Sequence, residues 1–422
     1  MDKLAIIGGR ELYGDIEIAG AKNSALKVMA ASLLTDETLQ LSQVPDLADV
    51  RQLLVLLNNH GVKAQRDGHR LLLDAGNITS TVAPYEIVRK MRASFNVLGP
   101  LLAREGQARV SLPGGCAIGA RPVDLHLKAF EAMGASIELD EGYVVAAAPE
   151  GGLRGAKISF PFVSVGATEH VMMAATLATG ETILENAARE PEIVDLANCL
   201  TAMGAKIEGA GRSTITIVGV ERLHAAEHEV LPDRIELGSY AMAVGAVGGE
   251  VLLRRGHRDL LGAAAEILEN CGLSLTDEVG GLRISRWGTP TVSTSVSTEA
   301  FPGFATDLQA QFMALMAKGD GAASIEETIF ENRFMHVPEL RRLGANISVD
   351  GRIATVHGVP TLKGAPVMAT DLRASMSLVI AALCAEGQTM ISRVYHLDRG
   401  FERLDDKLRG VGALIERVTD SE

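Results

Sequence analysis

The chain has 422 residues, with 40 Lys and Arg against 53 Asp and Glu, so its net charge is −13. Apolar residues make up 47% and charged residues 22%, a composition that excludes an intrinsically disordered chain. The length predicts two or more domains. The acidic balance disfavours binding to nucleic acid or to an anionic membrane, because it leaves no broad basic surface.

The N-terminal segment, MDKLAIIGGRELYGDIEIAG, has a strand-like pattern. Its apolar stretch from Leu4 to Ile7 is too short for a signal peptide. No other part of the chain has the run of roughly 18 apolar residues that a membrane helix needs. The segment precedes the first of six repeats and has no place in a closed set of three, so we expect it to pack with the C-terminal half.

Six copies of one pattern follow. In each copy an amphipathic helix ends at a glycine that precedes a short strand, as in EAMGASIEL and RRLGANISV. Such a glycine supplies the left-handed residue that caps a helix. An earlier helix in each copy, such as NSALKVMAASLLTDE, is apolar on most sides and should be buried. The glycines are Gly61, Gly134, Gly204, Gly272, Gly344 and Gly412.

The repeats predict an α/β fold with two domains of three repeats each. Each repeat should contain strands and two helices, one buried and one amphipathic. A boundary is expected at residues 229–233, after the third copy. We therefore expect one domain at 22–231 and a second at 1–21 plus 232–422.

Charged residues recur at the starts of the buried helices. Basic residues there oppose the helix dipole, so they favour a site for small anions such as phosphate or carboxylate. Helix capping is the alternative, and it explains Asp307 and Thr168 well but the basic residues badly. The positions are Lys22, Arg92, Thr168, Arg234 with Glu236, Asp307 and Arg373.

A second set of charged residues lies on the connection before each amphipathic helix. Arginines on such loops can hold a carboxylate or phosphate through two N–H groups, although each one alone is more often part of a surface ion pair. These residues are Arg121, Asp124, Glu190, Glu192, Arg333, Asp398 and Arg399.

The four cysteines are far apart and form no CxxC pair, which favours free thiols in a reducing cytoplasm. Cys116 lies in the glycine-rich segment SLPGGCAIGARP, whose composition is typical of a mobile flap. Beside Arg121 it should be an accessible, readily ionised thiol fit for acid–base or nucleophilic work, and the alternative is an incidental surface thiol. Cys199, Cys271 and Cys384 fall within helix patterns and are interpreted as core.

Two further motifs are rejected. The string HAAEH at residues 224–228 matches a zinc-binding pattern that requires a helix, but it lies between Gly219 and Pro232 without a third acidic ligand. We interpret it as a chance or surface match. The glycine-rich pieces IIGGRELYG and GGCAIGA lack the spacing of a dinucleotide or P-loop site.

The chain resembles the enolpyruvyl transferase family, in particular its members that act on UDP-N-acetylglucosamine. The resemblance covers essentially the whole chain, in blocks such as GAKNSALKVMAASLL, SLPGGCAIGARPVDLHLKAFEAMGA, ENRFMHVPELRRLGA and MATDLRASMSLVIAALCAEG. It implies two inside-out α/β domains, each of three pseudo-repeats with buried helices and outer sheets. It also implies that the N-terminal segment belongs to the second domain and that the active site occupies the interdomain cleft.

The reaction implied by the resemblance moves the enolpyruvyl group of phosphoenolpyruvate to the 3-hydroxyl of UDP-N-acetylglucosamine, through a tetrahedral ketal and with release of phosphate. This is the first committed step of peptidoglycan synthesis. Small-molecule substrates are then expected, with no metal, cofactor, nucleic acid or membrane, and the chain should be a monomer. Cys116 is expected to be the general acid and Asp307 the base for the sugar hydroxyl. The family's grip on phosphoenolpyruvate matches Lys22, Arg121 and Arg399, with Arg92 and Arg373 close by.

The family's contacts with the sugar nucleotide also have matching positions. Asn23 and Ile329 resemble the residues that contact the sugar. The segment that resembles the uracil pocket consists of Arg121, Pro122, Val123, Asp124 and Leu125. The segment that resembles the diphosphate cradle, at a helix N-terminus, consists of Ser164, Val165 and Gly166.

Two positions depart from the family pattern. Phe162 stands where a Lys is often found two residues before Ser164, so one phosphate contact is either missing or supplied by another residue. Asn96 stands where a Trp is common, and the single Trp of this chain is Trp287.

Two rival functions stay open. The enzyme 5-enolpyruvylshikimate 3-phosphate synthase shares the fold and phosphoenolpyruvate, but it would lack the cysteine flap and the GAKNSA and RPVDL segments. A non-catalytic sugar-nucleotide-binding paralogue would be free to lose Cys116, Asp307 and Lys22, all of which are present.

Overall fold

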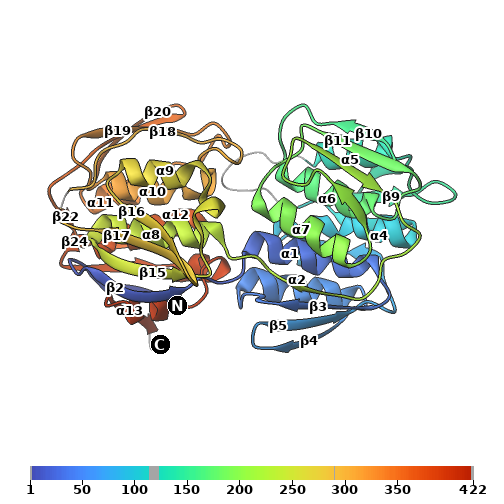
Figure 1. Ribbon diagram of the computed structural model, residues 1–422, viewed down its shortest axis with the longest axis horizontal. Helices are drawn as coiled ribbons and strands as arrows, with labels where there is room; N and C mark the ends of the chain where they lie inside the picture. The colour runs from blue at the N-terminus through green and yellow to red at the C-terminus, as the bar shows by residue number, and fades with distance from the viewer. Residues whose placement is uncertain (1, 114–122, 289, 420–422) are drawn as a thin grey trace. The chain divides into compact units, whose positions relative to one another are not determined.

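The computed structural model describes residues 2–113, 123–288 and 290–419. These residues form two compact units, which we call the first unit (residues 20–113 and 123–231) and the second unit (residues 2–19 and 232–419). The chain therefore begins in the second unit, passes to the first after Ala19, and returns after Leu231 (Figure 1).

The first unit contains α1 (Lys22–Ala31), η1 (Ser32–Leu34), α2 (Ala48–Asn59), α3 (Tyr85–Val88), η2 (Arg92–Val97), α4 (Leu98–Glu105), α5 (Asp124–Ala132), α6 (Val165–Ala175) and α7 (Pro191–Ala202). Its strands are β3 (Thr38–Ser42), β4 (Lys63–Asp67), β5 (Arg70–Asp74), β6 (Val82–Ala83), β7 (Gln107–Ser111), β8 (Ser136–Asp140), β9 (Tyr143–Ala147), β10 (Lys157–Ser159), β11 (Glu181–Glu185), β12 (Lys206–Glu208), β13 (Thr214–Val218) and β14 (Ala226–Glu229). The short elements labelled η are 3₁₀ helices.

The second unit contains α8 (Arg234–Val247), η3 (Arg258–Leu261), α9 (Ala263–Asn270), η4 (Thr306–Leu308), α10 (Gln309–Met316), α11 (Val337–Arg342), α12 (Leu372–Leu383), η5 (Val394–Arg399) and α13 (Leu404–Gly410). Its strands are β1 (Asp2–Ile7), β2 (Leu12–Glu17), β15 (Gly249–Arg254), β16 (Ser274–Glu278), β17 (Gly281–Arg286), β18 (Val296–Ser297), β19 (Ala322–Glu326), β20 (Asn346–Asp350), β21 (Ile353–His357), β22 (Leu362–Lys363), β23 (Pro366–Met368), β24 (Ala385–Glu386), β25 (Gln388–Ser392) and β26 (Leu414–Thr419).

Each unit is built from four-stranded sheets with one recurring topology. Among the described residues the sheets of the first unit have the orders β14-β3-β5-β4, β6-β7-β9-β8 and β10-β11-β13-β12. The four-stranded sheets of the second unit have the orders β2-β15-β17-β16, β18-β19-β21-β20 and β23-β25-β1-β26, and β22 pairs with β24 in a parallel two-stranded sheet. In each sheet the first strand is parallel to the second, and the remaining pairs are antiparallel.

The parallel edge strand of each sheet comes from the preceding repeat. In the first unit β6 and β10 extend into the next sheet along the chain, and β14 returns to the first sheet, so the three repeats close into a ring. In the second unit the N-terminal segment completes the ring. Strand β1 lies between β25 and β26 as the third strand of the last repeat, and β2 is the edge strand beside β15. This pairing explains why the N-terminal segment does not belong to the first three repeats.

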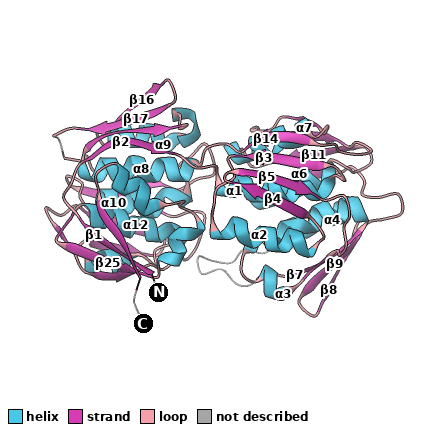
Figure 2. Cartoon of the chain, turned by 90° about the horizontal axis from the view of Figure 1, so that it is seen from below, coloured by secondary structure: helices cyan, strands magenta, loops and turns pink. Residues whose placement is uncertain are grey.

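The buried helices lie between the sheets, as Figures 1 and 2 show for each unit. They are α1, α4 and α6 in the first unit and α8, α10 and α12 in the second. Every residue of α10 is buried, as is every residue of α12 after its first. The prediction of buried helices and outer sheets is confirmed, because apolar side chains on all sides of a helix require cover on all sides.

The six repeat glycines also behave as predicted. Gly61, Gly134, Gly204, Gly272, Gly344 and Gly412 follow the ends of α2, α5, α7, α9, α11 and α13, with φ angles from +92° to +104°. An L side chain rarely adopts this conformation, so glycine ends each helix at the same point of its repeat.

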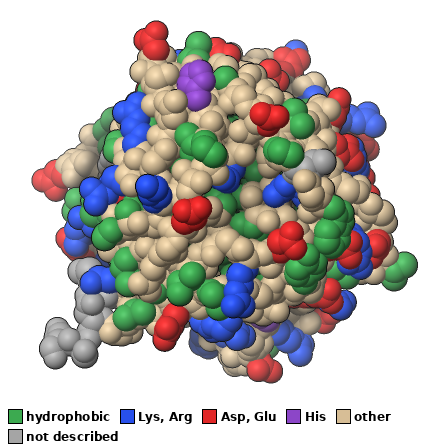
Figure 3. Space-filling view, turned by 90° about the vertical axis from the view of Figure 1, so that its left-hand side faces the viewer, with side chains coloured by type: hydrophobic (Ala, Val, Ile, Leu, Met, Phe, Trp, Pro, Cys, Tyr) green, Lys and Arg blue, Asp and Glu red, His purple; other side chains and the backbone are tan. Residues whose placement is uncertain are grey.

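The outer surface carries charge of both signs. On the face that Figure 3 shows, basic and acidic side chains are interspersed among polar and apolar ones. Within the described residues, none of the helices combines the length and the apolar character that crossing a membrane would demand.

Candidate functional site

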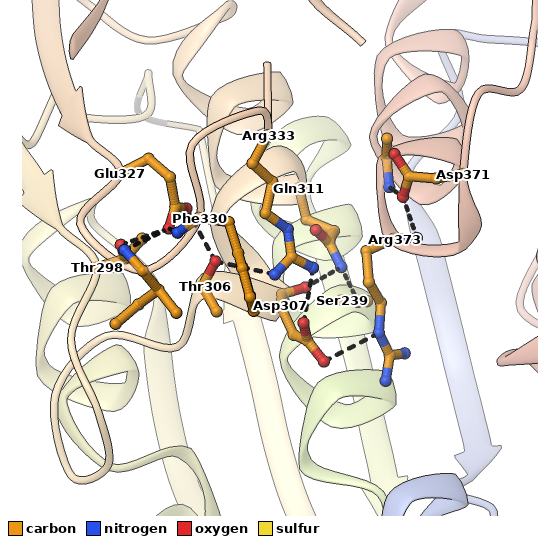
Figure 4. Close-up of polar contacts among 12 residues, drawn as sticks. Ser239, Thr298, Thr306, Asp307, Gln311, Glu327, Phe330, Arg333, Asp371 and Arg373 are labelled. Carbon is orange, nitrogen blue, oxygen red and sulfur yellow. Dashed lines mark hydrogen bonds and ion pairs between the residues drawn. The ribbon is translucent and has the colours of Figure 1, made fainter. Parts of the chain in front are cut away.

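Asp307 of the second unit lies between two arginines. It sits in η4, immediately before the buried helix α10. Nη2 of Arg333 donates to its Oδ1 at 2.7 Å, and Nε of Arg373 donates to its Oδ2 at 3.3 Å (Figure 4). The arginine side chains are only 7% and 5% exposed, whereas that of Asp307 is 26% exposed. Two nearby guanidinium groups favour the ionised carboxylate and fix its orientation.

This arrangement corrects the alternative reading of Asp307 as a helix cap. The N-cap residue of α10 is Leu308, which makes no side-chain capping bond. The carboxylate is engaged by the two arginines instead, and the helix begins through the preceding 3₁₀ turn.

Arg373 has unused hydrogen-bonding capacity. It is the second residue of α12, whose N-cap Asp371 accepts hydrogen bonds from the main-chain N–H groups of Arg373 and Ala374. Nη1 and Nη2 of Arg373 are buried and have no hydrogen-bond partner among the described residues. A buried guanidinium with unsatisfied donors is costly unless an anion occupies the place in front of it.

Arg333 belongs to a longer chain of polar contacts. Its Nη1 donates to Oγ1 of Thr306 at 2.9 Å, and that hydroxyl donates to Oε2 of Glu327 at 2.8 Å. Glu327 is buried and also accepts from Oγ1 of Thr298 at 3.1 Å. Figure 4 shows these side chains in a row that leads to Asp307.

Glu327 also fixes the loop that carries Ile329. Its Oε1 accepts the main-chain N–H groups of Ile329 at 2.9 Å and Phe330 at 3.1 Å. The side chain of Ile329, which was predicted to contact a sugar, is partly exposed at 39%. One buried carboxylate therefore links the Ile329 loop to the partners of Asp307.

Arg399 is the last residue of η5, which packs against α12. The preceding residue, Asp398, receives hydrogen bonds from Nη1 and Nη2 of Arg417 at 3.1 and 2.7 Å. The C-terminal strand β26 thus anchors the segment that carries Arg399. Arg373 and Arg399 lie on neighbouring elements of the same unit.

Arg234 and Glu236, at the start of α8, have a different role. The N-cap there is Asp233, and the guanidinium of Arg234 lies 5.5 Å from the centre of the Phe301 ring. Glu236 accepts from the main-chain N–H of Ala19 at 2.7 Å and from Nζ of Lys407 at 2.6 Å. Burial raises the pKa of Glu236 although Lys407 pulls it down. These contacts tie the N-terminal segment to α8 and α13.

In the first unit, Lys22 is the first residue of α1 and is almost completely buried. Its Nζ lies 3.6 Å from Oδ2 of Asp49. Asn23 follows it and is partly exposed, and Arg92 begins η2, which contacts α1. A lysine at a helix start adds its side chain to the positive end of the helix dipole, as an anion site requires.

The segments expected to hold uracil and diphosphate start neighbouring helices. Val123 is the N-cap residue of α5, and Asp124 and Leu125 form its first turn. Ser164 caps α6, where its Oγ accepts from the N–H of Ala167 at 3.3 Å, and Val165 and Gly166 follow. The two helices contact each other.

Thr168 is not a helix cap, so the capping alternative left open for it is wrong. It is the fourth residue of α6, where its hydroxyl donates to the carbonyl of Ser164 at 2.8 Å and accepts from the N–H of Ala188 at 3.0 Å. The cap lies one turn earlier because Ser164 already has the extended conformation and the oxygen that a cap needs.

Three predicted site residues, Cys116, Arg121 and Pro122, lie outside the described residues, so their roles stay predictions. Within the described residues, Lys22, Asn23, Arg92, Val123 to Leu125 and Ser164 to Gly166 belong to the first unit. Asp307, Ile329, Arg373 and Arg399 belong to the second. The remaining cysteines, Cys199, Cys271 and Cys384, are free thiols, of which the first two are buried and the third is half-buried.

The HAAEH string does not form a metal site. Residues 226–229 form strand β14 rather than a helix, and Nε2 of His228 contacts Oδ1 of Asp195 at 3.0 Å. His224 instead faces Glu37 at 3.3 Å. The described residues contain no group of three or more His, Cys, Asp or Glu side chains that could hold a metal ion. A shallow pocket of about 200 Å³ beside His228 contains none of the predicted site residues.

The two positions that depart from the family pattern differ in exposure. Phe162 is 60% exposed, in the connection before α6, whereas Asn96 is buried in η2. Trp287 belongs to the second unit, where its ring lies 5.9 Å from that of Tyr13.

Several residues that contact Asp307 or its partners were not predicted from the sequence. Thr306, Glu327 and Gln311 were not found because they belong to no recognisable motif. Gln311 donates to the main-chain oxygen of Asp307 at 2.9 Å and to Oγ of Ser239 at 3.0 Å. His126 was also missed, although it directly follows the RPVDL segment.

The sequence is similar to a known family and to several named proteins. Residues 6–408 match the family model described as EPSP synthase (3-phosphoshikimate 1-carboxyvinyltransferase). The chain is 61% identical to the UDP-N-acetylglucosamine 1-carboxyvinyltransferase of Sinorhizobium medicae, over 100% of both chains. It is also 61% identical to the protein of the same name from Caulobacter vibrioides, over 99% of this chain and 98% of that one.

Solved structures of enolpyruvyl transferases have a similar fold. The enolpyruvyl transferase NikO from Streptomyces tendae has a TM-score of 0.86 at 25% identity, over 100% of this chain and 99% of that one. An EPSP synthase from Acinetobacter baumannii has a TM-score of 0.76 at 18% identity, over 99% and 100%, which shows a shared fold.

Proposed function

The chain belongs to the family of UDP-N-acetylglucosamine 1-carboxyvinyltransferases, and on this premise we propose that it transfers the enolpyruvyl group of phosphoenolpyruvate to UDP-N-acetylglucosamine. The acceptor is the 3-hydroxyl of the sugar, and phosphate is released. We also propose that the reaction is the first committed step of peptidoglycan synthesis and that the enzyme is a monomer in the cytoplasm. The free thiols of Cys199, Cys271 and Cys384 support a reducing compartment.

The observation that carries this proposal is the buried guanidinium of Arg373. Its Nη1 and Nη2 are unsatisfied among the described residues, while its Nε is committed to Asp307. Phosphoenolpyruvate offers a carboxylate and a phosphate, either of which matches the planar fork of an arginine. We propose that the neighbouring carboxylate of Asp307 meets a hydroxyl group of the second substrate.

The proposed chemistry is an addition followed by an elimination. In the addition, the sugar oxygen bonds to C2 of phosphoenolpyruvate, its proton passes to Asp307, and Cys116 protonates the methylene carbon C3. In the elimination, the bond from C2 to the phosphate oxygen breaks, C3 returns a proton to the Cys116 thiolate, and the double bond is restored. The departing phosphate takes up the proton held by Asp307. Arg333 and Arg373 hold Asp307 as a carboxylate, so it accepts the proton as the hydroxyl becomes acidic during bond formation.

The remaining predicted residues bind substrate. Lys22, Arg92, Arg121 and Arg399 would neutralise phosphoenolpyruvate and the departing phosphate. The first turns of α5 and α6, from Val123 to Leu125 and from Ser164 to Gly166, would hold uracil and diphosphate. Asn23 and Ile329 would contact the sugar.

The decisive experiment measures phosphate release from phosphoenolpyruvate with UDP-N-acetylglucosamine or shikimate 3-phosphate as acceptor. Release with the sugar nucleotide alone is the expected result. Release only with shikimate 3-phosphate would replace the proposal with the EPSP synthase reaction. Tight binding of the sugar nucleotide without release in either case would indicate a non-catalytic paralogue.

A further inference from the structure

The first turn of α6 has two unused main-chain donors. The N–H of Ala167 is bound by Oγ of Ser164, and the N–H of Thr168 by the carbonyl of Ser164. The N–H groups of Val165 and Gly166 precede the first intrahelical bond and have no partner within the described chain. An 11-residue helix adds partial positive charge at this end, which suits an anion.

His126 of α5 lies against this turn. It is only 7% exposed, and its ring faces Gly166: a Cβ atom built on that glycine would lie 3.4 Å from Cε1 and 3.6 Å from Nε2. Nδ1 of His126 has a partner, but Nε2 makes no hydrogen bond within the part of the chain that the structure describes. A nine-tenths buried imidazole therefore presents an unpartnered nitrogen beside the free N–H groups of α6.

The neighbouring His170 determines which nitrogen of His126 carries the proton. The main-chain N–H of Gly99 donates to Nε2 of His170 at 2.7 Å, so that nitrogen is an acceptor without a proton. The proton of His170 must then lie on Nδ1, which is 2.8 Å from Nδ1 of His126. Nδ1 of His126 accepts it, and the proton of His126 is left on Nε2.

The pair is neutral and held in place. Burial, with Arg92 and Lys27 nearby, lowers the pKa of His126 to about 3, and burial also holds the pKa of His170 well below its usual value. Phe95 makes T-shaped ring contacts with both imidazoles, and Phe130 makes one with His170. Nε2–H of His126 is consequently a fixed, uncharged donor that points to the start of α6.

We propose that Nε2–H of His126 donates a hydrogen bond to a phosphate oxygen of the nucleoside diphosphate at the N-terminus of α6, with His170 and Gly99 fixing the required tautomer. This inference rests on the proposed function and adds a binding residue to it. It also supplies a phosphate contact in a chain that has Phe162 where a lysine is often found.

The first test compares His126→Phe with the native enzyme by calorimetry, with UDP and uridine as probes. Phenylalanine keeps the volume of a planar ring but removes the donor. The affinity for UDP should fall about tenfold, since a hydrogen bond to a charged group contributes of this order, while the affinity for uridine should not change. In turnover, the KM for UDP-N-acetylglucosamine should rise and that for phosphoenolpyruvate should stay constant. Unchanged UDP affinity in the variant would overturn the inference.

A second variant acts without altering the imidazole. Gly166→Ala places a methyl group beside Nε2 at ordinary van der Waals distance, so the protein should fold, but the donor is covered. Weaker UDP binding is expected. The matched control is Gly410→Ala at the end of α13, where a new Cβ meets nothing within 4 Å. Equal UDP affinities in both variants would contradict the proposed place of the phosphate.

The third test needs no variant. Nitrogen-15 NMR of histidine-labelled native enzyme should show the Nε2–H tautomer for His126 and the Nδ1–H tautomer for His170. A His126 protonated at Nδ1 would overturn the inference. These failures differ from a failure of the proposed function, in which the native enzyme itself would release no phosphate with the sugar nucleotide.

Discussion

Asp307 binds only one of the nitrogens of Arg373, at 3.3 Å through Nε, and the two terminal nitrogens of that buried guanidinium stay unsatisfied within the described chain. The carboxylate thus orients Arg373 but leaves its Nη1 and Nη2 without a partner among the described residues. A carboxylate and a guanidinium with two unsatisfied nitrogens therefore lie side by side among the described residues.

Arg373→Lys should therefore impair the use of phosphoenolpyruvate. A lysine keeps the charge but donates from a single nitrogen, so it cannot hold Asp307 through one nitrogen and present two others to an anion in a plane. We expect kcat/KM for phosphoenolpyruvate to fall about 100-fold, equivalent to roughly 3 kcal/mol, in steady-state assays of phosphate release. The affinity for UDP should be unchanged. Arg254→Lys is the control, because Arg254 forms an exposed ion pair with Asp15. Equal losses in the two variants would argue against an anion site at Arg373.

Arg333 should act on the rate through Asp307 rather than through substrate affinity. Its two η nitrogens reach Thr306 and Asp307 from two separate positions, which the single Nζ of a lysine cannot occupy at once. For Arg333→Lys we expect kcat to fall about tenfold or more, because a base displaced by even a small distance loses its alignment. Both KM values should change by less than about threefold, since the substrates are held by other groups. A rise in KM at constant kcat would show that Arg333 binds substrate directly. Arg341→Lys in α11, whose Nε binds the carbonyl of Ile347, serves as the control.

The repeat and its buried helices were predictable because they depend on local chemistry. A glycine with φ between +92° and +104° ends each amphipathic helix, and each buried helix is apolar on all sides. Both features recur in the sequence at nearly constant spacing. The closure of each ring by β14 and by β1 with β2 required the three-dimensional pairing, since those strands are far from their sheet partners in the chain.

The clusters were less accessible to sequence reasoning. Asp307 is 26 residues from Arg333 and 66 from Arg373, and His126 is 44 from His170. Asp307 and Arg373 could be selected from the sequence because each lies at the start of a buried helix. Whether such a residue caps its helix or forms an ion pair depends on which side chains the neighbouring elements bring close to it. The capping alternative for Thr168 and Asp307 could be rejected only with the structure, for this reason.

Gly99→Ala should destabilise the fold. A Cβ atom at this position of α4 would lie 2.6 Å from Cδ2 and 2.9 Å from Nε2 of His170 and 3.0 Å from its carbonyl oxygen. The added methyl group must displace the histidine, so the free energy of unfolding should drop by about 2 kcal/mol. Urea unfolding followed by fluorescence or circular dichroism measures the change, with Gly410→Ala as the control. An equally small effect in both variants would mean that the histidine pair is loosely packed.

Glu169 should give an unusual dependence of stability on pH. Burial raises the pKa of its carboxyl to about 7, although the ion pair with Lys27 pulls it down. Between the unfolded value near 4.5 and about 7, the folded state binds more protons than the unfolded state, so stability falls as pH rises through this range. The free energy of unfolding of the native protein relative to Glu169→Gln should therefore decrease from pH 4.5 to 7, by about 3 kcal/mol. A difference that is flat or rises with pH would show that Lys27 keeps Glu169 ionised.

Cys116 should be the thiol that reacts with fosfomycin, an epoxide that mimics phosphoenolpyruvate. A thiolate opens the epoxide to form a thioether, so reaction follows the ease of ionisation. Burial raises the pKa of Cys384 to about 12 and also raises those of Cys199 and Cys271, which disfavours these three. Peptide mass spectrometry after saturating exposure should find one adduct, on Cys116. Cys116→Ser should bind UDP-N-acetylglucosamine normally but lose most turnover. Full activity of Cys116→Ser would show that Cys116 is not the general acid. If Cys116 of the native enzyme stayed unmodified, it would not be the reactive thiol that both expectations require.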